Sequence, residues 1–360
     1  MARAMCFFTA MVSCCSMLPA ATPSPAQATE TLSAKVAASV NSVAKDRAGA
    51  VARVRSKDTR GEVNGSGFFI DSNGTLCTLA ELVQGSTEIT IIQAGREFQA
   101  RIAAIDPRSG VAFLKVGSAI ATPTNATATT YPANTSFITP GPLTKLPLLT
   151  PVLAIGVPRG ERAAISLGMI TGSQTHDGNH YFCVPQLLAG ISLAEGEAGA
   201  PLFGLSGNLV GMVSAGGQSS CRIMPSGVIE KLQRDFLRFG KFNPGWVGTV
   251  VETAAVPQGN SRTRVVSVEP GSPAEAAGLQ SGDMILSLAG KPIQEPEEVL
   301  GASFYLSGGD PVRLTIIRGG EQRVAEFRCG MIPRPSDRGR ALKSIAFRSF
   351  LEMTLPAAWA

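Results

Sequence analysis

The residues that could do chemistry in this chain lie in and around three short stretches: residues 65–71 (GSGFFID), 106–116 (DPRSGVAFLKV) and 195–202 (EGEAGAPL). In the third stretch, backbone N–H groups around Gly196 and Glu197 could stabilise an oxyanion, because such a site is built from amides rather than side chains. Covalent acyl transfer would also need a nucleophile, a base and a carboxylate that orients the base. The stretch places Ala198 after Glu197, and no G-x-S-x-G elbow occurs in the chain.

In order and spacing, the three stretches resemble the HtrA/Deg family of trypsin-like serine proteases. That family reads T-N-x-H-V-V after the first stretch, D-L-A-V-L-K in the second and G-N-S-G-G-P-L in the third. The matching positions here are Glu81, Gly110 and Ala198. The resemblance implies the protease fold, and the three residues imply a pseudoprotease, because a methyl group cannot form an acyl-enzyme and Gly110 supplies no carboxylate.

Two alternatives involve the only two histidines of the chain, His176 and His180. An intact but displaced triad would need one of them as its base, yet both follow the family's base position by about a hundred residues. A metal site would need both imidazoles on one face, whereas Gly178 and Asn179 between them predict a loop between strands. We expect no metal site and no cofactor.

A second resemblance, to a PDZ domain of the HtrA type, covers residues 245–330 and is carried by residues 272–285 (SPAEAAGLQSGDMI). It matches the family's S-P-A-x-x-A-G-L-x-x-G-D-x-I. PDZ domains bind a peptide as an added strand and capture its C-terminal carboxylate with backbone amides. The resemblance implies a carboxylate loop and a side-chain pocket formed by Trp246, Val247, Gly248, Thr249, Val299 and Ser303. Trp246 has a second interpretation, as a packing residue at the domain junction.

Composition and periodicity are consistent with these resemblances. Apolar residues make up 44% of the 360 residues, and the many glycines and prolines predict frequent turns. The two resemblances imply a mostly β fold class, with a chymotrypsin/trypsin-like double β-barrel (residues 50–240) followed by a small α+β PDZ domain. Residues 29–49 are expected to form a helix or arm, residues 121–147 the connection between barrels, residues 227–239 a closing helix and residues 331–360 a basic tail.

The N-terminus predicts export. Residues 1–28 combine Arg3, an apolar run over residues 5–18 that is short for a membrane helix, and a small-residue cleavage motif at residues 26–28. A lipoprotein signal at Cys14 and an uncleaved anchor remain alternatives. Each would place the mature chain in the periplasm or cell envelope.

Four cysteines lie beyond the signal: Cys77, Cys183, Cys221 and Cys329. An oxidising compartment favours a disulfide, and Cys183 with Cys221 is the preferred pair, because both flank the degenerate third stretch. The alternative is that all four are independent core residues.

The function expected from the sequence is that of a binding module: an HtrA-like pseudoprotease that uses its PDZ domain as a scaffold, regulator or chaperone. The partners would be peptide or protein C-termini, or an active HtrA-like relative. Membrane contact is expected only through an uncleaved or lipidated signal or the basic tail, and oligomers are possible. The net charge of +5 forms no concentrated basic stripe, so nucleic acid is not expected. The alternative function is an active serine endopeptidase of envelope quality control.

Overall fold

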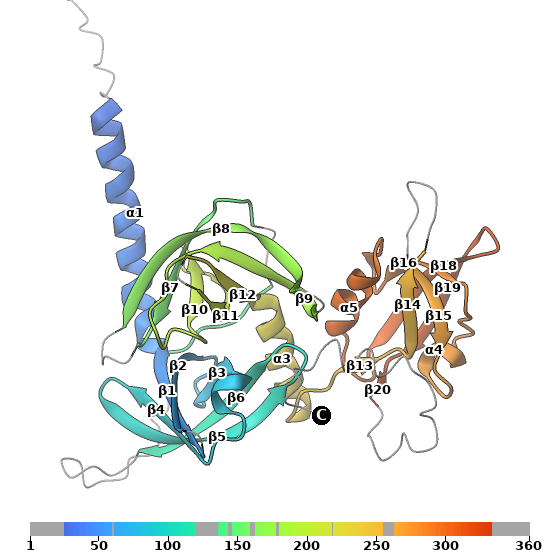
Figure 1. Ribbon diagram of the computed structural model, residues 1–360, viewed down its shortest axis with the longest axis horizontal. Coiled ribbons are helices and arrows are strands. Elements are labelled where there is room, and N and C mark those ends of the chain that lie inside the picture. Colours follow the sequence, from blue (N-terminus) through green and yellow to red (C-terminus); the bar gives the residue numbers. More distant parts are fainter. Residues whose placement is uncertain are drawn as a thin grey trace, which may run out of the picture.

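A computed structural model describes residues 25–59, 61–119, 136–142, 146–158, 163–177, 180–217, 219–254 and 263–332. Residues 1–24 of the expected signal, most of the connection at residues 121–147 and the tail from residue 333 lie outside the described residues. The first helix, α1 (Pro25–Arg47), includes the cleavage motif and the segment expected to be a helix or arm. Figure 1 shows α1 projecting beyond two adjacent barrels, with a smaller domain on their other side.

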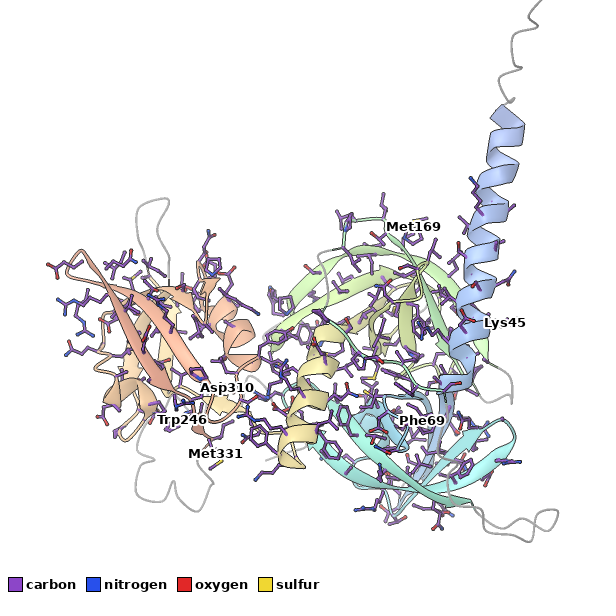
Figure 2. The ribbon with its side chains drawn as sticks, turned by 180° about the vertical axis from the view of Figure 1, so that it is seen from behind. Lys45, Phe69, Met169, Trp246, Asp310 and Met331 are labelled. Atoms are coloured by element: carbon purple, nitrogen blue, oxygen red, sulfur yellow. The ribbon has the colours of Figure 1, made fainter. Side chains whose placement is uncertain are left out.

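The first barrel is closed by six antiparallel strands in the order β1-β2-β3-β6-β5-β4 (Figure 1). Its strands are β1 (Val51–Asp58), β2 (Gly61–Phe69), β3 (Thr75–Leu79), β4 (Glu88–Gln93), β5 (Arg96–Asp106) and β6 (Val111–Ala119). The turn from β2 to β3 is fixed by Asp71, whose Oδ1 accepts the N–H groups of Asn73 and Thr75 at 2.8 and 3.0 Å. Phe68 and Phe69, which precede that turn at the end of β2, are fully buried (Figure 2 labels Phe69). The first sequence stretch therefore supplies part of this core.

The second barrel has the strand order β10-β11-β12-β9-β8-β7. Its strands are β7 (Pro151–Gly156), β8 (Ala164–Asp177), β9 (His180–Gly190), β10 (Pro201–Gly204), β11 (Leu209–Gly216) and β12 (Cys221–Pro225). The two strands expected on either side of Gly178 and Asn179 reach farther than predicted and include the histidines. His176 pairs with Tyr181 and Asp177 with His180, so the histidines lie at the facing ends of a β8–β9 hairpin.

Two helices position these barrels and the residues between them. The short α2 (Ala80–Val83) follows β3 directly, and α3 (Ser226–Phe239) closes the second barrel where the sequence predicts a helix. Val228, Ile229 and Leu232 form the buried face of α3. The helix ends at Gly240, whose φ of +69° is left-handed and whose N–H donates to the Phe236 carbonyl at 2.8 Å.

The smaller domain is built on the sheet order β14-β15-β16-β18-β19, with β17 paired to β16. Its elements are β13 (Gly245–Trp246), β14 (Thr249–Thr253), β15 (Thr263–Val268), α4 (Pro273–Ala276), β16 (Met284–Leu288), β17 (Lys291–Pro292), α5 (Pro296–Phe304), β18 (Pro311–Arg318), β19 (Glu321–Arg328) and β20 (Gly330–Met331). Ser272 caps α4 by accepting the Glu275 N–H at 3.1 Å, as its position before Pro273 predicts. Strand β14 lies at an edge of this sheet, so its outer backbone groups are available to another strand.

The expected Cys183–Cys221 disulfide was wrong: Cys77, Cys183, Cys221 and Cys329 are all free and buried. Cys221 pairs across strands with Ala189, which lies six positions beyond Cys183 along β9. At about 3.3 Å per residue, this separation is far beyond the reach of a disulfide. Burial raises the pKa of Cys183 and Cys221 to about 12, so both remain protonated thiols.

Among the described residues, no helix is both long and apolar enough to span a membrane.

Candidate functional site

The three positions that the family resemblance matches to a catalytic triad come from three different elements. Glu81 lies on α2, Gly110 in the turn between β5 and β6, and Ala198 in the loop between β9 and β10. The N–H of Ala80, next to Glu81, donates to the Gly110 carbonyl at 2.7 Å. The N–H of Ser66 donates to the Ala198 carbonyl, also at 2.7 Å. Backbone hydrogen bonds therefore hold the turn and loop against the first barrel, as a triad framework requires.

Gly65 brings α2 and the Ala198 loop together. A Cβ added to Gly65 would lie 2.3 Å from Leu82 Cδ1 and 3.1 Å from the Ala198 carbonyl oxygen. Only glycine fits between these two groups. Glycine at this position of the first stretch therefore allows the close approach of Leu82, which follows Glu81, to the loop that carries Ala198.

The loop at residues 195–202 is fixed by its backbone. Gly199 has a φ of +85°, and a Cβ there would lie 2.2 Å from the Ser66 carbonyl oxygen. Ser66 Oγ donates to the Gly196 carbonyl at 2.8 Å and accepts the Val157 N–H at 3.0 Å. Of the two amides expected to face an oxyanion, that of Glu197 donates to the Ala194 carbonyl at 3.2 Å. Within the described residues, the amides of Gly196 and Ala198 donate to no backbone carbonyl, so these two are the amides left for an acceptor.

Glu197 fills the interior of this loop rather than its surface. The residue is 0% exposed, and its Oε2 accepts the Ala194 N–H at 2.6 Å, whereas its Oε1 has no hydrogen-bond partner. Burial raises the pKa of the Glu197 carboxyl, and the Ala194 amide and the nearby Ser166 hydroxyl oppose that rise. A carboxylate with an unpartnered oxygen is a costly group to bury, so this position carries a local destabilisation.

We expect Glu197→Gln to stabilise the chain by about 1 kcal/mol at pH 7, because it removes a buried charge with an unpartnered oxygen. The folded-state pKa lies above 4.5, so the stability contribution of Glu197 is fully present below pH 4.5 and is lost as pH rises through the folded-state pKa. The gain should therefore disappear near pH 4. Denaturant unfolding at several pH values measures it, with exposed Glu88→Gln as the control. A gain in the free energy of unfolding that is equal at pH 7 and at pH 4 would contradict this account.

Glu81 and Gly110 offer no substitute for the missing chemistry. Glu81 is exposed, although surrounding atoms desolvate its carboxyl and raise its pKa, and the charge of Arg222 opposes that rise. Gly110 adopts a φ of +69°, and its missing Cβ would meet open space within 4 Å. The position thus has room for a side chain but a backbone conformation that favours glycine.

The sequence-predicted peptide-binding residues lie around one groove between β14 and α5. Its wall includes all six: Trp246, Val247, Gly248, Thr249, Val299 and Ser303. Gly248 has a φ of +86°, and a Cβ there would lie 2.2 Å from Ser272 Cβ. The loop that the resemblance assigns to carboxylate binding therefore lies close against the start of α4 at Gly248. Trp246 lines the groove and pairs with Gly330 of β20 in the same domain, so its alternative role at the domain junction stays a prediction (Figure 2 labels Trp246).

Sequence reasoning missed several residues of this groove. Ile285, Leu288 and Leu314 add apolar surface from the sheet, which makes the pocket suitable for an apolar side chain. Arg108, from the first barrel, also lines it. The three apolar residues could have been found from strand alternation, but nothing in the sequence links Arg108 to a groove more than a hundred positions away.

Among the described residues, no cluster of three or more His, Cys, Asp or Glu side chains could hold a metal ion. His176 is exposed at the end of β8. That the two histidines form no metal site stays a prediction.

Comparison with protein-family models identifies two domains. Residues 65–212 match the model described as a trypsin-like peptidase domain, and residues 264–318 match a PDZ domain. The first match contains all three degenerate positions. The second contains the cap of α4, strands β16, β17 and β18, and the groove helix α5.

Curated proteins are similar to this chain over most of its length. A probable periplasmic serine endoprotease DegP-like of Pseudomonas putida (strain GB-1) is 29% identical over 79% of this chain and 60% of its own length. A protein of the same name from Rhizobium meliloti (strain 1021) is 25% identical over 76% of this chain and 54% of its own length. The chain thus spans somewhat more than half the length of these relatives.

Solved structures share the fold. The HtrA-type protease AlgW with decapeptide aligns with a TM-score of 0.63 and 20% identity, covering 82% of this chain and 99% of that one. The serine endoprotease from Yersinia pestis aligns with a TM-score of 0.57 and 22% identity, covering 82% and 98%. The double barrel and the smaller domain therefore follow one another as in these proteins.

Proposed function

The chain is a member of the HtrA/Deg family, in which a trypsin-like peptidase domain is followed by a PDZ domain, and on that premise we propose that it is a pseudoprotease that binds peptides. It would take peptides or the C-termini of unfolded proteins into the PDZ groove and act as a scaffold, regulator or chaperone. Its relatives are named periplasmic, and the chain is exported to the same compartment.

One observation carries the proposal: a preserved loop with no nucleophile. Gly199, Ser66 and Gly65 maintain the close contacts of the loop, yet the residue between Glu197 and Gly199 is alanine. A methyl group forms no acyl-enzyme, and the positions of base and orienting carboxylate hold Glu81 and Gly110. A framework that remains folded while its reactive groups are absent supports a role in binding rather than in hydrolysis.

The groove supports the binding half of the proposal. Strand β14 is an edge strand, and an apolar pocket lies between it and α5. A peptide added beside β14 would complete its backbone hydrogen bonds and place an apolar side chain in the pocket. An HtrA-type protease with this fold has been solved with a decapeptide, which supports the same mode for this chain.

A second candidate function, an active serine endopeptidase, is favoured by the names of the curated relatives. It requires a nucleophile other than residue 198. Ser192 and Ser206 are the nearest serines on either side, out of register with the loop position. Hydrolysis by this chain would therefore need chemistry that its degenerate site does not offer.

The test of peptide binding is a groove variant. We expect Val299→Arg to weaken binding of a decapeptide with a C-terminal phenylalanine by at least about thirtyfold, because the new side chain occupies and charges the apolar pocket. The matched control is Val324→Arg on β19, where the valine is 46% exposed and lies outside the groove. Fluorescence anisotropy with the mature full chain measures both. Equal affinity of the two variants, or no binding by the natural chain, would refute the proposal.

A further inference from the structure

We propose that Arg108, a residue of the first barrel, completes the PDZ groove and pairs with the C-terminal carboxylate of the bound peptide. This inference rests on the proposed peptide binding and names one residue that decides which peptides are held. Arg108 lies in the turn after β5, two positions before the degenerate Gly110. The groove is therefore built by both domains rather than by the PDZ domain alone.

Arg108 is the only lysine or arginine among the described residues that line the groove. The wall also contains one acidic residue, Glu269, whose N–H donates to the Gly248 carbonyl at 2.9 Å. Glu269 thus lies close to the carboxylate loop, where its negative charge disfavours a peptide carboxylate. A cation in the same wall offsets that repulsion.

The guanidinium of Arg108 is held in place by two contacts. Its Nε donates to Asp106 Oδ1 at 3.1 Å, and its Cζ lies 4.6 Å from the centroid of the Phe304 ring. The side chain is 12% exposed, and Nη2 is buried with no hydrogen-bond partner. Asp106 therefore uses the Nε donor, while Nη2, next to it on the same edge of the guanidinium, lacks an acceptor.

The position of Phe304 fixes the end of the groove at which Arg108 lies. Phe304 is the last residue of α5, and the chain then runs to Leu306, whose carbonyl accepts the Gly245 N–H at 2.9 Å. Gly245 begins β13, which leads directly into the carboxylate loop. Arg108 is thus at the carboxylate end of the groove, near the start of β14, and not at the end that receives upstream peptide residues.

The chemistry of the two groups is complementary. A guanidinium binds a carboxylate through charge-assisted hydrogen bonds, often in pairs, and its planar geometry suits a bound terminus. A cation that lines an otherwise mostly apolar wall favours a negatively charged acceptor supplied by the peptide. Because Asp106 and Phe304 already orient the guanidinium, little side-chain entropy remains to be lost on binding.

The test compares one decapeptide, ending in phenylalanine, as the free acid and as the C-terminal amide. Both are titrated against the mature natural chain, Arg108→Gln, Arg108→Lys and Arg238→Gln. The last is a matched control: Arg238 also reaches the PDZ domain, through Asp310 at 3.3 Å, but does not line the groove (Figure 2 labels Asp310). Thermal melting of each variant confirms that it is folded.

We expect Arg108→Gln to weaken binding of the acid by about 10- to 100-fold and to leave the amide unchanged. The affinity of Arg108→Lys for the acid should lie between those of the natural chain and Arg108→Gln, because lysine keeps the charge and loses the planar pair of donors. Arg238→Gln should bind both peptides as the natural chain does. If Arg108→Gln does not fold, the Arg108→Lys comparison of acid with amide decides instead.

Three results would overturn the inference: unchanged binding of the acid by Arg108→Gln, an equal loss for acid and amide, or the same loss in Arg238→Gln. An equal loss would mean that Arg108 supports the groove only through packing. Failure of the natural chain to bind either peptide is a different outcome. It would refute the proposed function itself, and the inference with it.

Discussion

The purified mature chain is expected not to degrade an unfolded protein such as reduced casein, even at micromolar concentration over a day. Loss of the nucleophile alone lowers the rate of a serine protease on the order of a millionfold. Here Ala198 removes the nucleophile, and Glu81 and Gly110 hold the positions of base and orienting carboxylate. Gel electrophoresis of the substrate, with a serine-directed activity probe on the chain, measures the outcome.

Two variants make this result interpretable. Ala198→Ser should be as inactive as the natural chain, because the restored hydroxyl would still lack a base. The triple variant Glu81→His, Gly110→Asp and Ala198→Ser restores all three groups. The aspartate introduced by Gly110→Asp must adopt a left-handed φ, which aspartate tolerates better than most residues. Probe labelling of the natural chain would contradict the account, whereas activity confined to the triple variant would show that the framework alone was retained.

Replacing Asp235 with alanine is expected to destabilise the chain by about 3–5 kcal/mol, because it leaves the charge of Lys231 buried without its partner. Both side chains are 1% exposed or less, and Lys231 Nζ lies 2.5 Å from Asp235 Oδ2. Asp235 also accepts the Ser307 hydroxyl at 2.5 Å and the Asn243 N–H at 3.1 Å. The Asp235 carboxylate therefore connects α3 to Asn243, which lies between α3 and β13, and to Ser307 of the PDZ domain.

The control for Asp235→Ala is Arg238→Ala. Arg238 also reaches the PDZ domain from α3, but its side chain is 61% exposed, so the loss should stay below about 1 kcal/mol. Urea unfolding of the full chain, followed by circular dichroism, measures both variants. Equal midpoints for the two would show that the buried pair does not connect the domains.

Burial also lowers the pKa of Lys231, which makes a nearby carboxylate necessary to keep it charged.

Much of the fold could be predicted from sequence because the glycines at close contacts and the serine at a helix start are required there for physical reasons. Gly65 and Gly199 lie where an added Cβ would meet another chain segment at 2.2 to 2.3 Å, so these glycines mark tight contacts of the barrels. Ser272 before Pro273 marks the start of α4 because its hydroxyl caps that helix. Ser272 and Pro273 belong to the motif from which the PDZ domain was predicted, whereas the closing helix was predicted from the spacing of Val228, Leu232 and Phe236.

Features that depend on register or on another domain could not be predicted. Strand β12 (Cys221–Pro225) was missed because its sequence CRIMP is short, contains Arg222 and ends in proline. The disulfide was wrong because the offset of six residues between Cys183 and the partner of Cys221 exists only in the paired strands. Arg108 joins the groove through the packing of two domains, and its neighbours in sequence suggested only the degenerate Gly110.

The central claim is that the chain holds peptides without cutting them, and mass spectrometry of a bound peptide tests it most directly. The mature chain is incubated with a decapeptide ending in phenylalanine, the complex is separated by gel filtration after a day, and the peptide is released and weighed. The account predicts saturable recovery of the intact peptide and loss of that recovery in Val299→Arg. Recovery of shortened fragments with the natural chain, absent from a control without it, would contradict the account.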